Sequence, residues 1–346
     1  DGRQIPIVNP GGHANYVSQL TVKMKKTHGK WVVEHVDAEN VSMEGLEPDA
    51  DFLTTFEPQK EEVKAYVGKR IGTFVNPIST QDAYFGSSSF MDFIHQMQLS
   101  ITHADISLAA PLSFNATIPA GDVYVRDMFN LYKYENMLYT MMLTGREVLG
   151  HLEMSYGQWV NQMRSPNDHL LLFKESADGV QNKNKTGKGR PEFRNIYYNF
   201  DSAAGIIYEV DVTKPVGQRV HIISMADGTP FDPDKTYRVA VNSYRGNGGG
   251  ELLTRGAGIP QEELSKRIDY STDADLRFFM LNYIELRDTL NPQPLGQWKF
   301  VPESMAKAAG ERDRDLHPLL RHALRFDEAA HPVKDLPFHA NSVLFY

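Results

Sequence analysis

The pattern of hydrophobic and polar positions near the start of the chain predicts strands followed by a helix. Residues 16–24 and 31–36 read as two strands joined by a polar turn at residues 26–30. Two strands cannot form a hydrophobic core alone, so we expect them to pack against the rest of this chain or against another domain. Residues 46–68 then form a loop and a charged helix, which Pro58 is expected to break or kink.

From residue 69 onward, strand-like and helix-like patterns are interspersed without a regular repeat. Strands are predicted at residues 70–75, 105–110, 136–143, 208–212, 219–225 and 237–241. Helices are predicted after three starts: the serines at 87–89, the capping-box pair Thr144 and Glu147, and the triplet 271–273. This order predicts an α+β fold with a mixed β-sheet and flanking helices.

Two stretches fall outside this core pattern. Residues 174–195 are polar and rich in Lys, Asn and Gly, which is typical of a surface excursion. Residues 302–346 are a charged extension with helical character.

Composition removes several classes of function. The net charge of −8 gives no general basic field, so polymeric nucleic acid is not an expected partner. The absence of cysteine excludes disulfides, thiolate catalysis and sulfur-ligated zinc. No apolar run approaches the ~20 residues that span a bilayer.

The catalytic motifs of a self-contained hydrolase are also missing. The 12 histidines are scattered, and none falls in H-E-x-x-H or H-x-H spacing. There is no G-x-S-x-G elbow and no phosphate-binding loop lysine. The sequence therefore gives no indication of a complete active site within this chain.

A strand followed at once by a tyrosine and a glycine run is the first candidate site. The strand 237–241 leads into Asn242-Ser243-Tyr244-Arg245-Gly246-Asn247-Gly248-Gly249-Gly250. Such glycines are favoured where the backbone needs positive φ or lies against a ligand. Tyr244 could then stack on a flat ring such as a nucleobase. The other interpretation, a glycine-rich hairpin loop with a surface tyrosine, stays open.

A second tyrosine stands at the mouth of another strand. Tyr134 precedes the predicted strand 136–143, and Asn136 supplies an amide that can both donate to and accept from a base edge. Tyr134 and Tyr244 would then lie at equivalent ends of two strands. The alternative is that both are half-buried tyrosines at the edge of the core.

Several motifs in a fixed order together resemble one known family. They are Ile106-Ser107-Leu108-Ala109-Ala110-Pro111, Leu131-Tyr132-Lys133-Tyr134-Glu135-Asn136, Leu143-Thr144-Gly145-Arg146-Glu147, Tyr198-Asn199-Phe200-Asp201 and Asn242 to Gly250. Over roughly residues 70–300 the chain resembles the C-terminal domain of the 5′-nucleotidase / 2′,3′-cyclic-nucleotide 2′-phosphodiesterase family.

The resemblance implies that the chain grips a nucleotide or nucleoside. In the family two aromatic residues sandwich the base, and they correspond to Tyr134 and Tyr244. The amide that touches the base corresponds to Asn136. Further substrate contacts are expected from polar and backbone groups at Asn115, Arg245, Asn247, Gly248, Gly249 and Gly250.

The resemblance places the chemistry outside this chain. Two divalent metal ions and a catalytic His–Asp pair belong to an N-terminal metallophosphoesterase domain, of which residues 1–45 would be the last strands. Residues 46–68 would be a linker helix, 69–301 the substrate-recognition domain, and 302–346 an extension beyond the resemblance. No catalytic residue, metal or other cofactor is then expected in this chain, which we interpret as a fragment or processed product that is inactive alone.

Two departures bear on the branch of the family. Asn115 stands where the 5′-nucleotidase branch has a substrate-holding arginine, and Gly250 stands where that branch has an aspartate. Both stacking positions are tyrosines. These features are more similar to the cyclic-phosphodiesterase/3′-nucleotidase branch, and the position of the phosphate stays open.

The family is usually exported, which implies a periplasmic or cell-surface bacterial protein. A stand-alone binding or interaction module with the same fold is the alternative.

Overall fold

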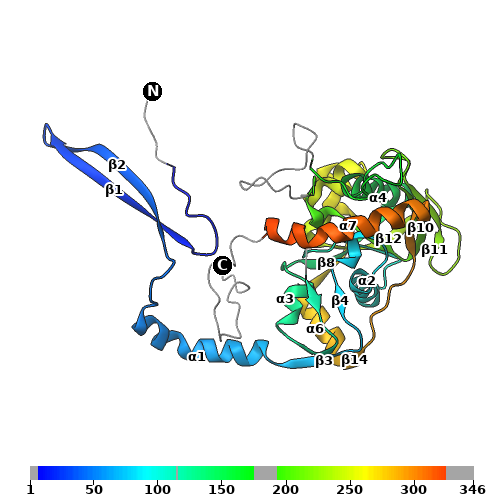
Figure 1. The fold of residues 1–346 in the computed structure, drawn as a ribbon, viewed down its shortest axis with the longest axis horizontal. Coiled ribbons are helices and arrows are strands. Elements are labelled where there is room, and N and C mark those ends of the chain that lie inside the picture. The colour runs from blue at the N-terminus through cyan, green and yellow to red at the C-terminus, as the bar shows by residue number, and fades with distance from the viewer. Residues whose placement is uncertain (1–6, 114–115, 175–192, 325–346) are drawn as a thin grey trace. The chain divides into compact units, whose positions relative to one another are not determined.

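The computed structural model describes the backbone of residues 7–113, 116–174 and 193–324, with side chains up to Arg314. The chain divides into two compact units, one that contains residues 1–65 and one that contains residues 66–332. Figure 1 labels helices and strands of both units.

The first unit consists of a β-hairpin and most of a helix. Strands β1 (Tyr16–Thr27) and β2 (Lys30–Ser42) pair antiparallel, as predicted, but each is longer than its sequence pattern indicated. Helix α1 (Ala50–Val67) follows and is continuous through Pro58, so the predicted break there is wrong. Proline removes the N–H that would bond the carbonyl of Thr54. Because Thr54 is exposed, water can bond this carbonyl instead.

The hairpin has one apolar face. Directly paired residues point to the same side, and the register places Leu20 with Ala38, Val22 with Val36, Met24 with Val33 and Lys26 with Trp31. Except for Val36, which is partly buried, the large apolar side chains on this face are about half exposed or more, from 49% for Val22 to 65% for Trp31. A two-stranded ribbon that is exposed in this way has no core of its own.

The second unit is built around a five-stranded mixed sheet. Its strand order is β13 (Ile268–Asp275), β8 (Met137–Thr144), β12 (Thr236–Asn242), β5 (Ile106–Ala109) and β9 (Ser202–Ala204). Strand β12 pairs parallel with β5 and antiparallel with β8, and β9 pairs antiparallel with β5. The predicted α+β class with a mixed sheet is confirmed.

Shorter sheets surround the central one in the part of the chain that the structure describes. One joins β11 (Val220–Met225), β10 (Ile206–Asp211) and β15 (Trp298–Val301). Another joins β14 (Thr289–Leu290), β3 (Arg70–Phe74) and β7 (Gly121–Tyr124), and a two-stranded pair joins β4 (Ile78–Ser79) to β6 (Thr117–Ile118).

Local capping signals account for two of the three predicted helix starts. The main helices are α2 (Ser89–Thr102), α3 (Asp127–Leu131), α4 (Gly145–Trp159), α6 (Leu276–Arg287) and α7 (Glu303–Leu324). The Ser88 hydroxyl accepts a bond from the Met91 N–H, and the capping box of Thr144 and Glu147 is fully formed. The predicted cap at residues 271–273 is wrong, because Asp275 caps α6 and the triplet lies within β13.

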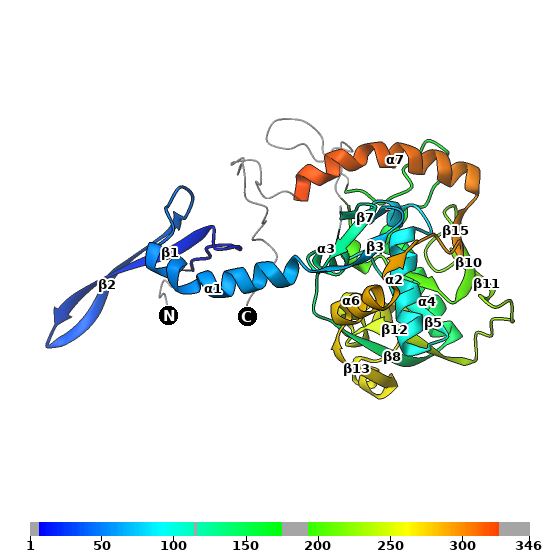
Figure 2. The same ribbon diagram turned by 90° about the horizontal axis from the view of Figure 1, so that it is seen from below.

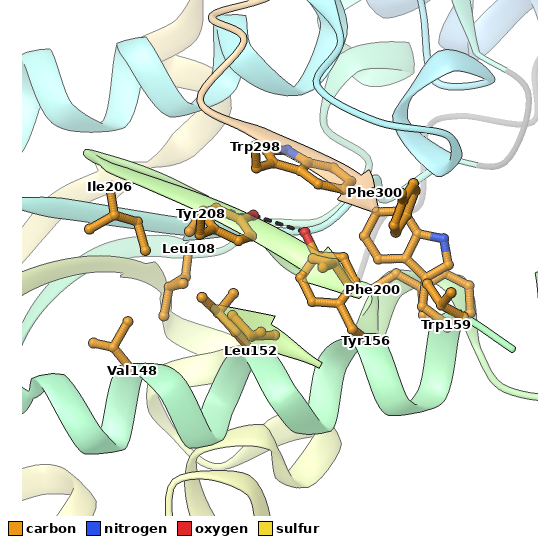
Figure 3. Packing of buried hydrophobic residues seen from close by; sticks show 14 of the residues in the cluster. Leu108, Val148, Leu152, Tyr156, Trp159, Phe200, Ile206, Tyr208, Trp298 and Phe300 are labelled. Atoms are coloured by element: carbon orange, nitrogen blue, oxygen red, sulfur yellow. Dashed lines mark hydrogen bonds between the residues drawn. The ribbon is translucent and has the colours of Figure 1, made fainter. Parts of the chain in front are cut away.

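Hydrophobic side chains cover both faces of the central sheet. Alternate residues of one strand divide between two clusters: Val239 and Val241 face a cluster with α4, whereas Ala240 faces a cluster with α2 and α6. Figure 2 shows α2, α4 and α6 around the strands from a second direction. The first cluster is rich in aromatic rings, and Figure 3 shows Tyr156, Trp159, Phe200, Tyr208, Trp298 and Phe300 packed together. The sheet is therefore held from both sides.

Helix α7 is fastened to this core near its middle. Ala306, Ala309 and Asp313 are buried, and the Asp313 carboxylate accepts bonds from the backbone N–H groups of Leu170 (2.8 Å) and Leu171 (2.9 Å). The extension that begins at residue 302 is thus integrated into the second unit as far as its side chains are described.

Replacing Asp313 with alanine is expected to lower the free energy of unfolding by about 2–4 kcal/mol, because it leaves two buried N–H groups without acceptors. Urea denaturation followed by circular dichroism measures the change. Glu311→Ala on the exposed side of α7 is the control, with an expected change within about 0.5 kcal/mol. Equal stability of the two variants would contradict the anchoring role of Asp313.

Candidate functional site

The topology of the central sheet brings four connecting segments to one edge. Strands β5 and β12 are parallel and end there, whereas β8 and β9 run the other way and begin there. The segments after β5 and β12 and the segments before β8 and β9 therefore meet at this edge. They include residues 132–136, 197–201 and 243–250, which contain most of the side chains singled out in the sequence.

Tyr134 and Tyr244 stand on two of these segments and share a neighbour. Their exposed fractions are 40% and 41%. The ring of Tyr198 lies 6.3 Å from that of Tyr134 and 6.2 Å from that of Tyr244, centroid to centroid, and is nearly perpendicular to both, at 76° and 84°. The structure therefore gathers three tyrosines at the edge of the sheet, of which sequence reasoning had assigned a role to two.

The segment after β12 begins as one short helical turn. Helix α5 (Ser243–Gly246) is capped by the Asn242 side chain, which accepts a bond from the Arg245 N–H (2.8 Å). The Ser243 hydroxyl accepts a bond from the Met137 N–H (3.1 Å) and so ties this turn to the start of β8. These two bonds fix the backbone on either side of Tyr244.

The glycine run supplies the backbone freedom that the sequence predicted. Gly248 and Gly250 have positive φ of 95° and 71°. At Gly249 a Cβ would lie 2.5 Å from Cε2 of Tyr244, so only glycine lets this backbone pack against the tyrosine ring. At Gly250 a Cβ would lie 2.2 Å from Oδ1 of Asn199, so an aspartate here would require the loop to rearrange.

Arg245 lies beneath the loop in a buried ion pair. Its Nε and Nη2 donate to the two carboxylate oxygens of Asp201 at 2.9 and 2.7 Å. The same guanidinium donates to the carbonyls of Tyr198 and Gly249 and to the side chain of Asn199. The Arg245 and Asp201 side chains are 3% and 2% exposed. Arg245 therefore fastens the segment before β9 to the glycine loop.

The charge of Asp201 is compensated from two sides. Burial alone would raise the pKa of Asp201, but the Arg245 guanidinium and the hydrogen bond with His151 hold it at about 2. His151 Nε2 lies 2.8 Å from the carboxylate, and burial lowers the pKa of this imidazole. Asp201 is thus an ionised carboxylate inside the protein, and its partners keep it there.

The remaining predicted residues occupy varied positions. Asn136 is partly exposed, and its amide donates to the Tyr132 hydroxyl (3.3 Å). Asn247 is exposed, and its carbonyl accepts a bond from Gln261 (3.0 Å). Asn115 lies outside the described residues.

Other potential sites are less developed. Among the described residues there is no group of three or more His, Asp or Glu side chains arranged to hold a metal ion. In the same part of the chain, no helix has the length and apolar character that crossing a membrane requires. A groove of about 640 Å³ runs along α4 past Leu149, Met154 and Val216, and none of the predicted site residues lines it.

Curated proteins that are similar to this chain have names that describe enzymes acting on nucleotides. The chain is 26% identical over 332 residues to the trifunctional nucleotide phosphoesterase protein YfkN of Bacillus subtilis. This match covers 87% of the chain and 21% of that protein. It is also 25% identical to the 2′,3′-cyclic-nucleotide 2′-phosphodiesterase/3′-nucleotidase of Haemophilus influenzae. This match covers 86% of the chain and 48% of that protein. The chain therefore spans about half or less of the length of these relatives.

Comparisons with solved structures agree on the fold. A putative 5′-nucleotidase from Staphylococcus aureus superposes with a TM-score of 0.58 at 19% identity, covering 83% of this chain and 50% of that one. A 5′-nucleotidase precursor from Thermus thermophilus gives 0.51 at 20% identity, covering 84% and 50%. The sequence model of the 5′-nucleotidase C-terminal domain matches residues 70–255, which is more than half of the chain and includes the three clustered tyrosines. The chain belongs to the 5′-nucleotidase C-terminal domain family.

Proposed function

We propose that this chain is the nucleoside-recognition part of a metal-dependent nucleotide phosphoesterase, and that Tyr134 and Tyr244 stack on the two faces of the base. The observation that supports the proposal is the position of these partly exposed rings on two segments at one edge of the sheet, both in contact with Tyr198. Stacking on aromatic side chains accepts every base, because every base has a π-face. Broad nucleoside tolerance follows.

Polar groups around the rings would complete the grip. The Asn136 amide is partly exposed beside Tyr134 and can meet a base edge. The backbone of Gly249 packs against the Tyr244 ring, and Gly248 and Gly250 flank it in the same loop, so in this proposal the loop backbone borders the base. In this proposal Asn115 and Asn247 are further polar contacts, and Arg245 acts by holding the loop.

The reaction itself is assigned to another domain of the same protein. Holding the nucleoside would fix the phosphate at two divalent metal ions on an N-terminal metallophosphoesterase domain, and positioning of this kind promotes reaction. The exposed apolar face of the β1–β2 hairpin fits a role for residues 1–45 as the last strands of that domain, with residues 46–68 as a linker helix. Metal-dependent hydrolysis of 2′,3′-cyclic AMP by this chain alone would contradict the division.

The boundaries and location follow from the same proposal. Residues 69–301 would form the recognition domain, and residues 302–346 an extension that supports it through α7. An exported bacterial protein, periplasmic or at the cell surface, is the proposed setting. The phosphate position, whether 5′, 3′ or 2′,3′-cyclic, is left to the catalytic domain.

Nucleoside binding by the chain tests the proposal. Two stacked faces at ~1–3 kcal/mol each give an expected dissociation constant for adenosine of about 1 mM. Tyr134→Ala and Tyr244→Ala should each weaken binding by about tenfold or more, measured by NMR titration. Tyr66→Ala, at a tyrosine of α1 that is 58% exposed, is the matched control and should bind like the wild type. Unchanged affinity in both site variants would remove the stacking site.

A further inference from the structure

Tyr198 is the aromatic residue that joins the two proposed stacking rings. It belongs to the single turn η2 (Tyr197–Asn199), just before β9. Its ring is nearly perpendicular to those of both Tyr134 and Tyr244, at about equal centroid distances of 6.3 and 6.2 Å. A base stacked parallel to either tyrosine would therefore lie nearly perpendicular to the Tyr198 ring.

The position of Tyr198 is fixed from behind. Its carbonyl accepts a bond from Arg245 Nη2 (3.0 Å), and the Asn199 side chain accepts one from Nη1 (3.1 Å). Phe200 then enters the core, where its ring stacks on Trp159 at 5.7 Å and 2° (Figure 3). A group held in this way before a ligand arrives loses little freedom on binding.

The Tyr198 hydroxyl is available for a ligand. It makes no hydrogen bond to any residue that the structure describes, and the side chain is partly exposed. By contrast, the buried hydroxyls of Tyr156 and Tyr208 bond each other (2.8 Å). Burial raises the pKa of Tyr134, and the neighbouring phenols of Tyr198 and Tyr244 act in the same direction.

Stacking alone cannot choose among bases, because every base offers a similar face. Choice requires a polar group at the base edge, where the bases differ in their donors and acceptors. We propose that the Tyr198 hydroxyl contacts the edge of the bound nucleobase and sets the order of affinity among bases. This inference rests on the proposed function, and it makes Tyr198 a specificity-determining residue beside the two stacking tyrosines.

Tyr198→Phe is the sharpest test, because it removes only the hydroxyl and keeps the ring contacts. Dissociation constants for adenosine, guanosine, cytidine and uridine would be measured by NMR titration of the whole chain. The ratio between the tightest and weakest nucleoside should change by about threefold to tenfold in the variant, the expected effect of one hydrogen bond. Tyr66→Phe removes a hydroxyl from an exposed tyrosine of α1 and should leave all ratios unchanged.

The outcomes separate this inference from the function on which it rests. If the wild type binds no nucleoside, both fail. If Tyr244→Ala weakens binding but Tyr198→Phe keeps the wild-type ratios, only the role of Tyr198 is overturned. Uniform weakening of all four nucleosides by Tyr198→Phe also overturns it, because a purely structural role predicts that result. Tyr198→Ala should change the ratios at least as much as Tyr198→Phe.

Discussion

Replacing Asp201 with alanine is expected to destabilise the second unit by about 3–5 kcal/mol, the usual cost of removing one partner from a buried ion pair. The guanidinium of Arg245 would remain inside the protein without its counter-charge, at a side chain that is 3% exposed. His151 would lose the acceptor that its Nε2 faces at 2.8 Å. The Ser155 hydroxyl donates to the backbone carbonyls of Asp201 (2.7 Å) and Asn199 (3.5 Å), so the substitution leaves these contacts in place.

Urea denaturation measures the free energy of unfolding of the variant, and an exposed arginine–aspartate pair on the surface serves as the control. Arg146 and Asp234 also form a two-bond pair, at 2.7 and 3.2 Å, but their side chains are 69% and 71% exposed. Asp234→Ala should therefore cost less than about 1 kcal/mol. If the two substitutions cost the same, burial does not govern the Asp201 pair. Replacing Asp201 and Arg245 together with apolar residues should restore part of the lost stability.

Helix starts could be predicted where their signal is local. The capping box joins Thr144 and Glu147 through hydrogen bonds between residues three apart, so the local sequence contains both residues that form it. At residues 271–273 the same kind of signal fails. The Thr272 hydroxyl there accepts a bond from the Leu138 N–H (3.0 Å) across the sheet instead of capping a helix. Pairing with β8 overrides the local preference, and it is not visible in the sequence around Thr272.

The candidate site was predictable to a similar extent. Tyr134 and Tyr244 stand next to recognisable strands, so their common edge followed once those strands were taken as neighbours. Tyr198 reaches them because β9 pairs antiparallel with β5, a contact between residues about a hundred positions apart. Asp201 belongs to one of the motifs that carry the resemblance, but the sequence does not indicate its role, because its partner Arg245 is distant in sequence. A carboxylate just before a short apolar strand and an arginine beside a glycine run are weak signals alone.

A second buried group makes stability depend on pH. His95 of α2 is fully buried, with its ring nitrogens 2.9 Å from the Ser107 hydroxyl and 3.1 Å from that of Ser202. Burial disfavours the imidazolium and lowers the pKa of His95 to about 4, although the carboxylates of Asp92 and Asp201 oppose this shift. The neutral imidazole, bonded on both sides, is therefore the form that the folded core accepts.

Acidification from pH 6.5 to 4 is consequently expected to remove about 3 kcal/mol of stability through His95. In the unfolded chain the pKa of His95 is about 6.5. Between this pH and about 4, the imidazole is protonated in the unfolded chain but stays neutral in the folded chain, so acidification favours unfolding. The difference in unfolding free energy between pH 7 and pH 4.5 should shrink in His95→Gln, in which an amide replaces the imidazole, by comparison with the wild type. His221→Gln, at an exposed position of β11, is the control and should retain the wild-type difference. His151, whose pKa burial also lowers, acts in the same direction in every variant, so the comparison isolates His95. An undiminished pH dependence in His95→Gln would mean that other groups cause the loss at low pH.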